Sequence, residues 1–359
     1  MTWLAWRQLR TSAIATFGAL LALAVVLALT GPDLVHLYDT TVKPCPSIGD
    51  CSGAVAAFGK KYNFLQQLLT IVMQVTPALL GVFWGAPLIA RELETGTYRL
   101  AWTQSVTRTR WLATKLALTG LATAALAGLL SLAVTWWYAP LDKAGTNRFD
   151  GSVFGERGIT PIGYALFAFA VGALLGLIIR RTLPAMATTL VAFIAVRLVF
   201  SQLIRPHLLA PVRATFTLGA TVNGYASSNG GPTNLTAGNP SDASLQNAWI
   251  YSARIVDASG HALTPQATAS ACPQLANVGL QTPLPPAGSA GNVHAVPAPG
   301  GGQALQQCAA KLSTSYHTVL TYQPANRYWT FQTLETAIFA ALAITLGGAA
   351  FWYLHKRLS

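Results

Sequence analysis

The side chains best suited to chemistry in this chain gather in one short segment, residues 91–115. Its sequence is RELETGTYRLAWTQSVTRTRWLATK, with seven charged side chains, although charged residues make up only 9% of the chain. Glycine ends helices, and Thr or Ser caps their first turns. We therefore predict a helix that stops at Gly96, a short helix capped by Thr97, and a further helix capped by Ser105 or Thr107. Charged side chains held this way suit the docking of another molecule.

The aromatic side chains of this segment also favour docking. Tyr98 and Trp102 are four residues apart and share one face of the predicted short helix, whereas Arg99 points elsewhere. The alternative is a solvated loop whose charges only follow the positive-inside rule. Because a helix stop, a short helix and a new helix start occur in one compact run, we favour the docking element.

Elsewhere the sequence contains no recognisable catalytic or metal-binding pattern. The six histidines lie outside the apolar stretches and lack the spacing of zinc ligands. Neither Gly-x-x-x-x-Gly-Lys-Ser/Thr nor Leu-Ser-Gly-Gly-Gln occurs, so we do not expect the chain to bind ATP productively by itself. The prediction is a protein that is not an enzyme and has no cofactor or metal of its own.

The composition of the 359-residue chain indicates an integral membrane protein, with 52% hydrophobic residues. The net charge of +12 is too diluted by apolar runs to form a phosphate-binding groove, so we exclude nucleic acid as a partner. A helix needs about 20 apolar residues to cross the lipid bilayer. Six stretches qualify as membrane spans: 12–30, 64–90, 116–138, 162–179, 183–204 and 331–353.

The distribution of Lys and Arg predicts the orientation of these spans. Basic residues are densest in the short segments on the side of the N-terminus, which places both termini in the cytoplasm of a multi-pass plasma-membrane protein. Residues 3–9 predict an interfacial helix before a first span that is retained rather than cleaved as a signal peptide. Residues 180–184, with two arginines and a proline, predict a tight cytoplasmic hairpin between spans four and five.

The four cysteines fall on the opposite side of the membrane, where disulfides persist. They permit three pairings. We favour Cys45–Cys51 and Cys272–Cys308, because each bond closes a loop within one segment. The alternative, free thiols or metal ligands, has no support from Cys-x-x-Cys spacing or a nearby histidine.

The segment before the last span is long enough to form a domain outside the membrane. Alternating aromatic and β-branched side chains predict a strand over 247–257 and a turn at 258–260, whereas the Pro- and Gly-rich residues 282–302 predict an irregular loop. The expected fold class is an all-α membrane protein with a small, disulfide-stapled, α+β or irregular domain between helices five and six. The predicted domains are 1–204 with five transmembrane helices, 205–328 outside the membrane, and 329–359 with the sixth helix and the tail.

Two ionisable side chains lie inside the predicted spans at similar depths. Arg197 lies about 10 Å and Glu335 about 6 Å from the outer membrane surface, from the rise per residue of a helix. We predict that they pair, either as a structural clamp or as part of an outer gate. The alternative is that Arg197 extends towards water without a partner.

The second span is the most polar and the most easily bent of the six. Gln67 and Gln74 supply amide groups and Pro77 interrupts the helix, so we predict that this span lines a translocation path. The pairs Gly81/Gly85 and Gly172/Gly176 have the spacing of close helix packing, which also occurs by chance in spans rich in small residues.

The segment after the second span resembles the permease subunits of type-2 ABC exporters. The resemblance rests on the run Glu92-Leu93-Glu94-Thr95-Gly96-Thr97, followed by an Arg-x-Arg pair and a lysine that enters the third span. Residues 322–329 are similar to an actinobacterial subgroup of unassigned substrate. The order of the six spans and the large outer insertion fit the same family.

This resemblance implies partners that the chain itself lacks. Two permease chains, as a homodimer or heterodimer in the lipid bilayer, would each bind a separate ATP-binding subunit that holds ATP and Mg. The residues facing that subunit would come from the docking element: Glu92, Glu94, Gly96, Thr97, Tyr98, Arg99 and Trp102.

The predicted function is therefore the membrane-spanning subunit of an ATP-driven exporter. It would move an amphipathic or hydrophobic compound, such as an antibiotic, a peptide or a lipid, by alternating access. The alternatives are an ABC-coupled sensor or scaffold whose outer domain binds a ligand, and a secondary transporter. The absence of Asp from every span disfavours the last of these.

Overall fold

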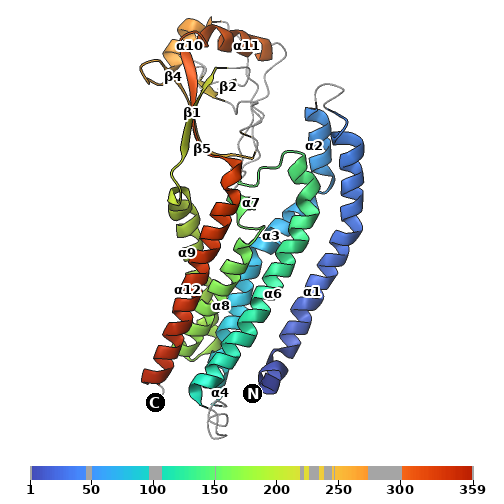
Figure 1. Cartoon of the computed structure of the whole chain (residues 1–359), viewed down its shortest axis with the longest axis vertical. Helices are drawn as coiled ribbons and strands as arrows, with labels where there is room; N and C mark the ends of the chain where they lie inside the picture. The colour runs from blue at the N-terminus through green and yellow to red at the C-terminus, as the bar shows by residue number, and fades with distance from the viewer. Residues whose placement is uncertain are drawn as a thin grey trace. The chain divides into compact units, whose positions relative to one another are not determined.

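The computed structural model of the chain divides into two compact units, residues 1–209 with 328–359 and residues 210–327. We call them the membrane unit and the inserted unit. The structure describes residues 2–45, 51–96, 107–149, 151–218, 222–225, 234–237, 245, 247–273 and 301–357. In Figure 1, the long helices of the membrane unit run side by side, and both ends of the chain lie where α4 ends.

Six helical stretches of the membrane unit are long and apolar enough to cross a membrane, as the sequence predicts. The candidate spans are Ile14–Val42, Asn63–Thr95, Arg108–Lys143, Thr160–Ile179, Thr182–His207 and Ala325–Lys356. The helices that form them, with their short π and 3-10 turns, are α1 (Thr2–Leu37), η1 (Tyr38–Val42), α3 (Asn63–Leu80), η3 (Gly81–Gly85), α4 (Ala86–Thr95), α6 (Arg108–Lys143), α8 (Thr160–Ile179), α9 (Thr182–Val199), η4 (Phe200–Ile204), η5 (Arg205–His207) and α12 (Tyr328–Arg357). The expected mostly helical fold with six spans is confirmed.

We name the two ends of this bundle by the connections they carry. At the hairpin end, α4 ends, α6 begins, and α8 turns into α9. At the insertion end, η5 ends and α12 begins. Short helices α2 (Ser52–Lys61) and α7 (Gly151–Phe154) lie in the connections at the insertion end. Helix α1 runs unbroken from Thr2, so no separate interfacial helix precedes the first span.

The predicted hairpin between spans four and five is present. Arg180 ends α8 in the left-handed conformation with φ 58°, and Arg181 is extended before α9 begins at Thr182. A left-handed residue is a common way to stop a helix, and it is usually glycine. Here the following proline, at position 184, lies in the first turn of α9, where its missing N–H costs nothing.

Spans two and four are in backbone contact through the two glycine pairs. A Cβ on Gly81 would lie 2.6 Å from the Ala168 carbonyl oxygen, and one on Gly172 would collide with the Gly81 carbonyl oxygen. Gly85 and Gly176 are equally constrained by α8 and α4. The small-xxx-small spacing therefore marks a real interface, in which each motif packs against the other. Span four is the most buried, which makes α8 the centre of the bundle.

The inserted unit combines antiparallel strands with two short helices. Strand β5 (Tyr316–Gln323) lies between β1 (Val212–Thr217) and β4 (Trp249–Asp257), whereas β2 (Val222–Tyr225) and β3 (Asn234–Ala237) form a separate pair. The strand predicted over 247–257 is thus confirmed, and Gly260, with φ 85°, forms the turn after it. The helices are α10 (Pro265–Ala271) and α11 (Gly301–Leu312), and the short η8 (Ala325–Arg327) ends the unit.

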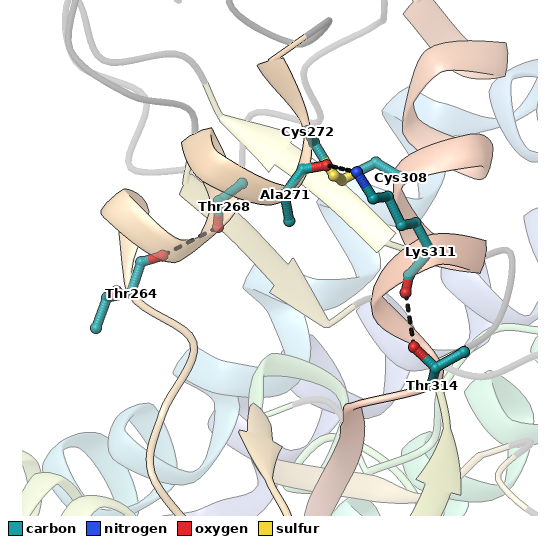
Figure 2. The surroundings of a disulfide bond; sticks show 7 residues. All are labelled: Thr264, Thr268, Ala271, Cys272, Cys308, Lys311 and Thr314. Atoms are coloured by element: carbon teal, nitrogen blue, oxygen red, sulfur yellow. Dashed lines mark hydrogen bonds between the residues drawn. A yellow bond between two sulfur atoms is a disulfide. The ribbon is translucent and has the colours of Figure 1, made fainter.

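Both favoured disulfides are present. Cys45–Cys51 closes the loop after the first span, and Cys272–Cys308 joins the end of α10 to α11 (Figure 2). Lys311 Nζ adds a 2.8 Å hydrogen bond to the Ala271 carbonyl oxygen beside this second bond. The predicted loop 282–302 lies outside the described residues except for 301–302, which begin α11 instead.

Candidate functional site

A buried ion pair joins spans two and three at the hairpin end. Glu92 on α4 contacts Lys115 on α6, and both residues are less than 10% exposed. Lys115 Nζ also lies 3.5 Å from the Leu88 carbonyl oxygen and 5.0 Å from the centre of the buried Trp111 ring. Because a cation over an aromatic face is attracted by the ring, Trp111 holds Lys115 in place from the other side.

Glu94 lies about half a turn after Glu92 on α4. It joins span two to span five. Its Oε2 accepts hydrogen bonds from the Thr182 backbone nitrogen at 2.9 Å and from the Thr182 hydroxyl at 2.6 Å. The residue at the N-cap of α9, Arg181, provides no side-chain cap of its own. Glu94 therefore caps α9 from another helix, with its negative charge at the positive end of the helix dipole.

The predicted helix boundaries around the docking element agree with the structure where it is described. Helix α4 ends at Thr95, and Gly96 follows with φ 75°. Helix α6 begins after Thr107, whose hydroxyl accepts a 3.3 Å bond from the Arg110 backbone nitrogen. The predicted docking residues Thr97, Tyr98, Arg99 and Trp102 lie outside the described residues. Their roles remain predictions.

At the insertion end, Glu335 pairs with Arg205 and not with Arg197, so the pair predicted from the sequence is wrong. Arg205 donates to the Glu335 carboxylate through Nε at 2.9 Å and Nη2 at 2.8 Å, and the Tyr164 hydroxyl donates to the same carboxylate. Glu335 is fully buried and Arg205 is 3% exposed.

The physical reason is the length of span five. The sequence analysis ended this span at residue 204 and assigned Arg205 to the outer domain. In the structure the helix continues through the π turn η4 and the 3-10 turn η5 to His207, so Arg205 still faces the bundle. Arg197 lies eight residues earlier, about 12 Å along a helix axis, and its guanidinium stacks 3.7 Å from the centre of the Tyr164 ring.

Gln332 fixes the start of α8 to α12. Its Oε1 accepts hydrogen bonds from the Ile159 and Thr160 backbone nitrogens, each at 3.1 Å, and from the Thr160 hydroxyl at 2.9 Å. Its Nε2 donates to the Phe154 carbonyl oxygen at 2.9 Å and to the Tyr328 hydroxyl at 3.2 Å. A fully buried amide with all these groups satisfied locks two helices together.

The connection between spans three and four folds back into the membrane unit, which the sequence analysis missed. Arg157 is 4% exposed, donates to Asp142 at 2.7 Å, and lies 4.1 Å from the centre of the Tyr138 ring. The more exposed Arg148 also contacts Asp142, at 3.2 Å. The signal available in the sequence was Gly155-Glu156-Arg157-Gly158, two charges between glycines directly after an aromatic residue.

Glu156 in this connection is buried beside span two. It is 4% exposed, and its Oε1 accepts a 2.8 Å hydrogen bond from Gln74 Nε2. Burial raises the pKa of the Glu156 carboxyl to about 7. Hydrogen bonds from Gln74 and Thr70 and the charges of Arg157 and Arg197 act in the opposite direction and lower this pKa.

The three residues predicted to line a translocation path lie in different surroundings. Gln74 binds Glu156, Gln67 is exposed, and Pro77 is buried within α3 just before the π turn η3. Their part in translocation remains a prediction. In the described ranges, no group of three or more His, Cys, Asp or Glu side chains could hold a metal ion. The polar groups of the membrane unit thus connect helices to one another.

Six apolar helices, tied to each other by buried polar contacts at both ends, define a multi-pass membrane protein. The family model named ABC-2 membrane transporter related matches residues 17–205, more than half of the chain. The chain belongs to this family, and it is a membrane transporter permease. Membership implies an ABC transporter system with a separate ATP-binding subunit. No curated protein and no solved structure matches the chain.

Proposed function

We propose that this permease exports an amphipathic or hydrophobic compound by alternating access, driven by an ATP-binding subunit that docks on residues 91–115. In this proposal two permease chains form the transport path as a homodimer or heterodimer in the plasma membrane. The hairpin end and both termini face the cytoplasm, and the ATP-binding subunit holds ATP and Mg.

The observation that carries the proposal is the pair of links made by the last turns of α4. Glu92 binds Lys115 of α6, and Glu94 caps α9 at Thr182. Helix α4 ends directly after these two links, at Gly96, and α6 begins after its cap, Thr107. A force applied to the segment between these two helices would therefore reach spans two, three and five at once.

The same force would also reach span four. Gly172 and Gly176 of α8 approach η3 and α4 so closely that no side chain fits between them. Backbone-to-backbone packing transmits a displacement directly from one helix to the other, because closely packed protein interiors have low compressibility. Spans two to five would thus move as a connected group when the partner subunit closes on ATP.

The insertion end would supply the opposite gate. Separating α12 from the rest of the bundle there would break the pair between Glu335 and Arg205 and the bonds that Gln332 makes. Both are buried, so opening this end would leave buried polar groups without partners and would be costly. The actinobacterial subgroup and the chemical identity of the cargo stay predictions from the sequence.

The test combines the chain with its ATP-binding partner in lipid nanodiscs. We expect Glu94→Gln to lower ATP hydrolysis by the complex at least about fivefold while the two subunits still purify together, because a lost charge weakens the cap at α9. Thr182→Val removes the hydroxyl from the other side of the same link. Asp39→Asn, which neutralises an exposed carboxylate paired with Lys43, is the matched control.

The outcomes separate the competing interpretations. If Thr182→Val and Glu94→Gln act alike, the link between α4 and α9 transmits the force; if only Glu94→Gln acts, Glu94 contacts the partner directly. Unchanged hydrolysis in Glu94→Gln contradicts the proposed coupling. ATP-dependent accumulation of a lipophilic dye in inverted vesicles tests the export direction. Hydrolysis that depends on Glu94 without any flux would favour the ABC-coupled sensor.

A further inference from the structure

Among the described residues, three buried carboxylates lie near the insertion end, and they differ in their partners. Asp142 contacts two arginines, and Glu335 is bound by Arg205 through two nitrogens. Glu156 accepts hydrogen bonds only from neutral groups among the described residues, the Gln74 amide and the Thr70 side chain. In the part of the chain that the structure describes, no basic side-chain nitrogen lies within 4.0 Å of a Glu156 carboxylate oxygen.

Arg157 and Arg197 lie close enough to act on Glu156, yet no described cation makes an ion pair with its carboxyl. The Tyr138 hydroxyl donates elsewhere, to the Gln66 carbonyl oxygen, while the Arg157 guanidinium is turned towards Asp142 and Arg197 lies over Tyr164. One nitrogen of Arg157, Nη2, is buried with no hydrogen-bond partner among the described residues. The groups that act on Glu156 or on its neighbours are Thr70 and Gln74 of α3, Tyr138 and Asp142 of α6, Arg157, Tyr164 of α8 and Arg197 of α9.

We propose that Glu156 is a proton-binding site. In the conformation described here its carboxyl holds a proton, and it releases that proton when residues 151–159 separate from α3 and water reaches the side chain.

The proton replaces the counter-charge that Glu156 lacks. A buried carboxylate without an ion pair is unstable, and protonation removes the charge without any need for space. The bond from Gln74 survives protonation, because the carbonyl oxygen of a neutral carboxyl still accepts it. The two neighbouring carboxylates keep their own cations, Asp142 with Arg157 and Glu335 with Arg205.

The linkage between this proton and the conformation has a definite sign. The pKa of Glu156 rises from its ordinary value of 4.5 to about 7 in this conformation, because the side chain is buried. Between those two pH values the packed conformation binds more protons than a hydrated one. Its stability from this group is full below pH 4.5 and is lost as the pH rises towards 7. Acid therefore favours the packed conformation.

The proton would influence the same span that carries the docking element. Gln74 is part of α3, which continues through η3 into α4 without a break. Release of the proton would weaken the contact between span two and the connection after span three. This consequence for the transport cycle rests on the proposed function, whereas the proton site itself does not.

The test is an infrared pH titration of the purified full-length chain in nanodiscs. We expect a protonated-carboxyl band that titrates with a midpoint near pH 7. It should vanish in Glu156→Gln and persist in Asp39→Asn. A titration near pH 7 that Glu156→Gln leaves unchanged, or the absence of any such band from the wild-type chain, would overturn the proposal. The measurement needs no ATP-binding partner, so its failure is distinguishable from a failure of the proposed function.

A second variant keeps the test decisive if Glu156→Gln does not fold. Gln74→Leu removes the amide that stabilises the charged carboxylate, so the midpoint should rise by about one pH unit. A midpoint that stays the same or falls would mean that the titrating group is not the one beside Gln74. Where Glu156→Gln does fold, its melting temperature should lose the decline between pH 4.5 and 7 that the wild-type chain shows.

Discussion

The two ends of the helix bundle use carboxylates in different ways. At the hairpin end, Glu92 binds Lys115 and Glu94 binds Thr182, and both links start from the last turns of α4. At the insertion end, Asp142, Glu156 and Glu335 lie among four arginines and a fully bonded glutamine, on several helices at once. The described carboxylate links of the hairpin end therefore start from one helix, whereas those of the insertion end are spread over several elements.

This difference indicates where the bundle can be pushed and where it resists. In the proposed function, links that start from one helix end suit a place where a partner applies force, because that helix end can move as a unit. In the same proposal, the buried network of the insertion end would have a large cost of opening, because breaking a buried pair leaves an uncompensated charge. The backbone contact between η3 and α8 connects the two ends.

The variant with the largest expected effect on this difference between the two ends removes one charge from the insertion end. Arg205→Met leaves the fully buried Glu335 without its cation, and breaking a buried pair from one side costs about 3–5 kcal/mol. We expect the largest drop in melting temperature of any variant discussed here. Arg205→Met combined with Glu335→Leu should recover most of the loss. A single variant as stable as the wild-type chain would show that the insertion end is not held by this pair.

The connection between the ends can be tested with one methyl group. Gly172→Ala places a Cβ against the Gly81 carbonyl oxygen and 2.7 Å from the Ala86 nitrogen. Overpacking of this kind costs about 1–3 kcal/mol. Gly347→Ala is the matched control, because a Cβ there meets nothing within 4 Å. Equal melting temperatures for the two variants would contradict the close approach of spans two and four.

A smaller effect is expected from the hairpin end. Glu94→Ala removes the cap of α9, and the loss of an N-cap costs about 0.5–2 kcal/mol. Hydrogen exchange should accelerate in the first turn of α9, at residues 182–186, while the start of α8 near Gln332 stays protected. If protection falls equally at both places, the two ends are not held independently.

The smallest effect sets the scale for the others. The exposed pair between Asp39 and Lys43, at 3.3 Å, lies outside both networks. Asp39→Asn should change the stability by about 0–1 kcal/mol, because exposed ion pairs contribute little. A loss as large as that of Arg205→Met would mean that burial does not separate the strong contacts from the weak ones.

Local signals predicted much of this molecule correctly. Long apolar runs predicted the six spans, and Gly96 predicted the end of α4. The alternation of side-chain types over 247–257 predicted the strand β4. The disulfides also followed from the sequence, because each bond closes a loop within one segment. These features depend on residues close together in the chain, so composition and spacing are sufficient.

The predictions that were wrong or missing concern contacts between distant residues. Residue counts along ideal helices placed Arg197 at the depth of Glu335. They did not include the π and 3-10 turns that extend span five and bring Arg205 to Glu335. The sequence analysis did not single out the charges in the connection after span three, although Glu156 and Arg157 are buried.

The sequence by itself determined that this chain has six membrane spans, that α4 stops at Gly96, and which cysteine pairs are favoured. Only the tertiary structure decided which charge meets which. The physical reason is that an ion pair between helices requires the right depth, rotation and crossing of both helices together. Each of these depends on packing around α8 and not on the residues adjacent in the chain.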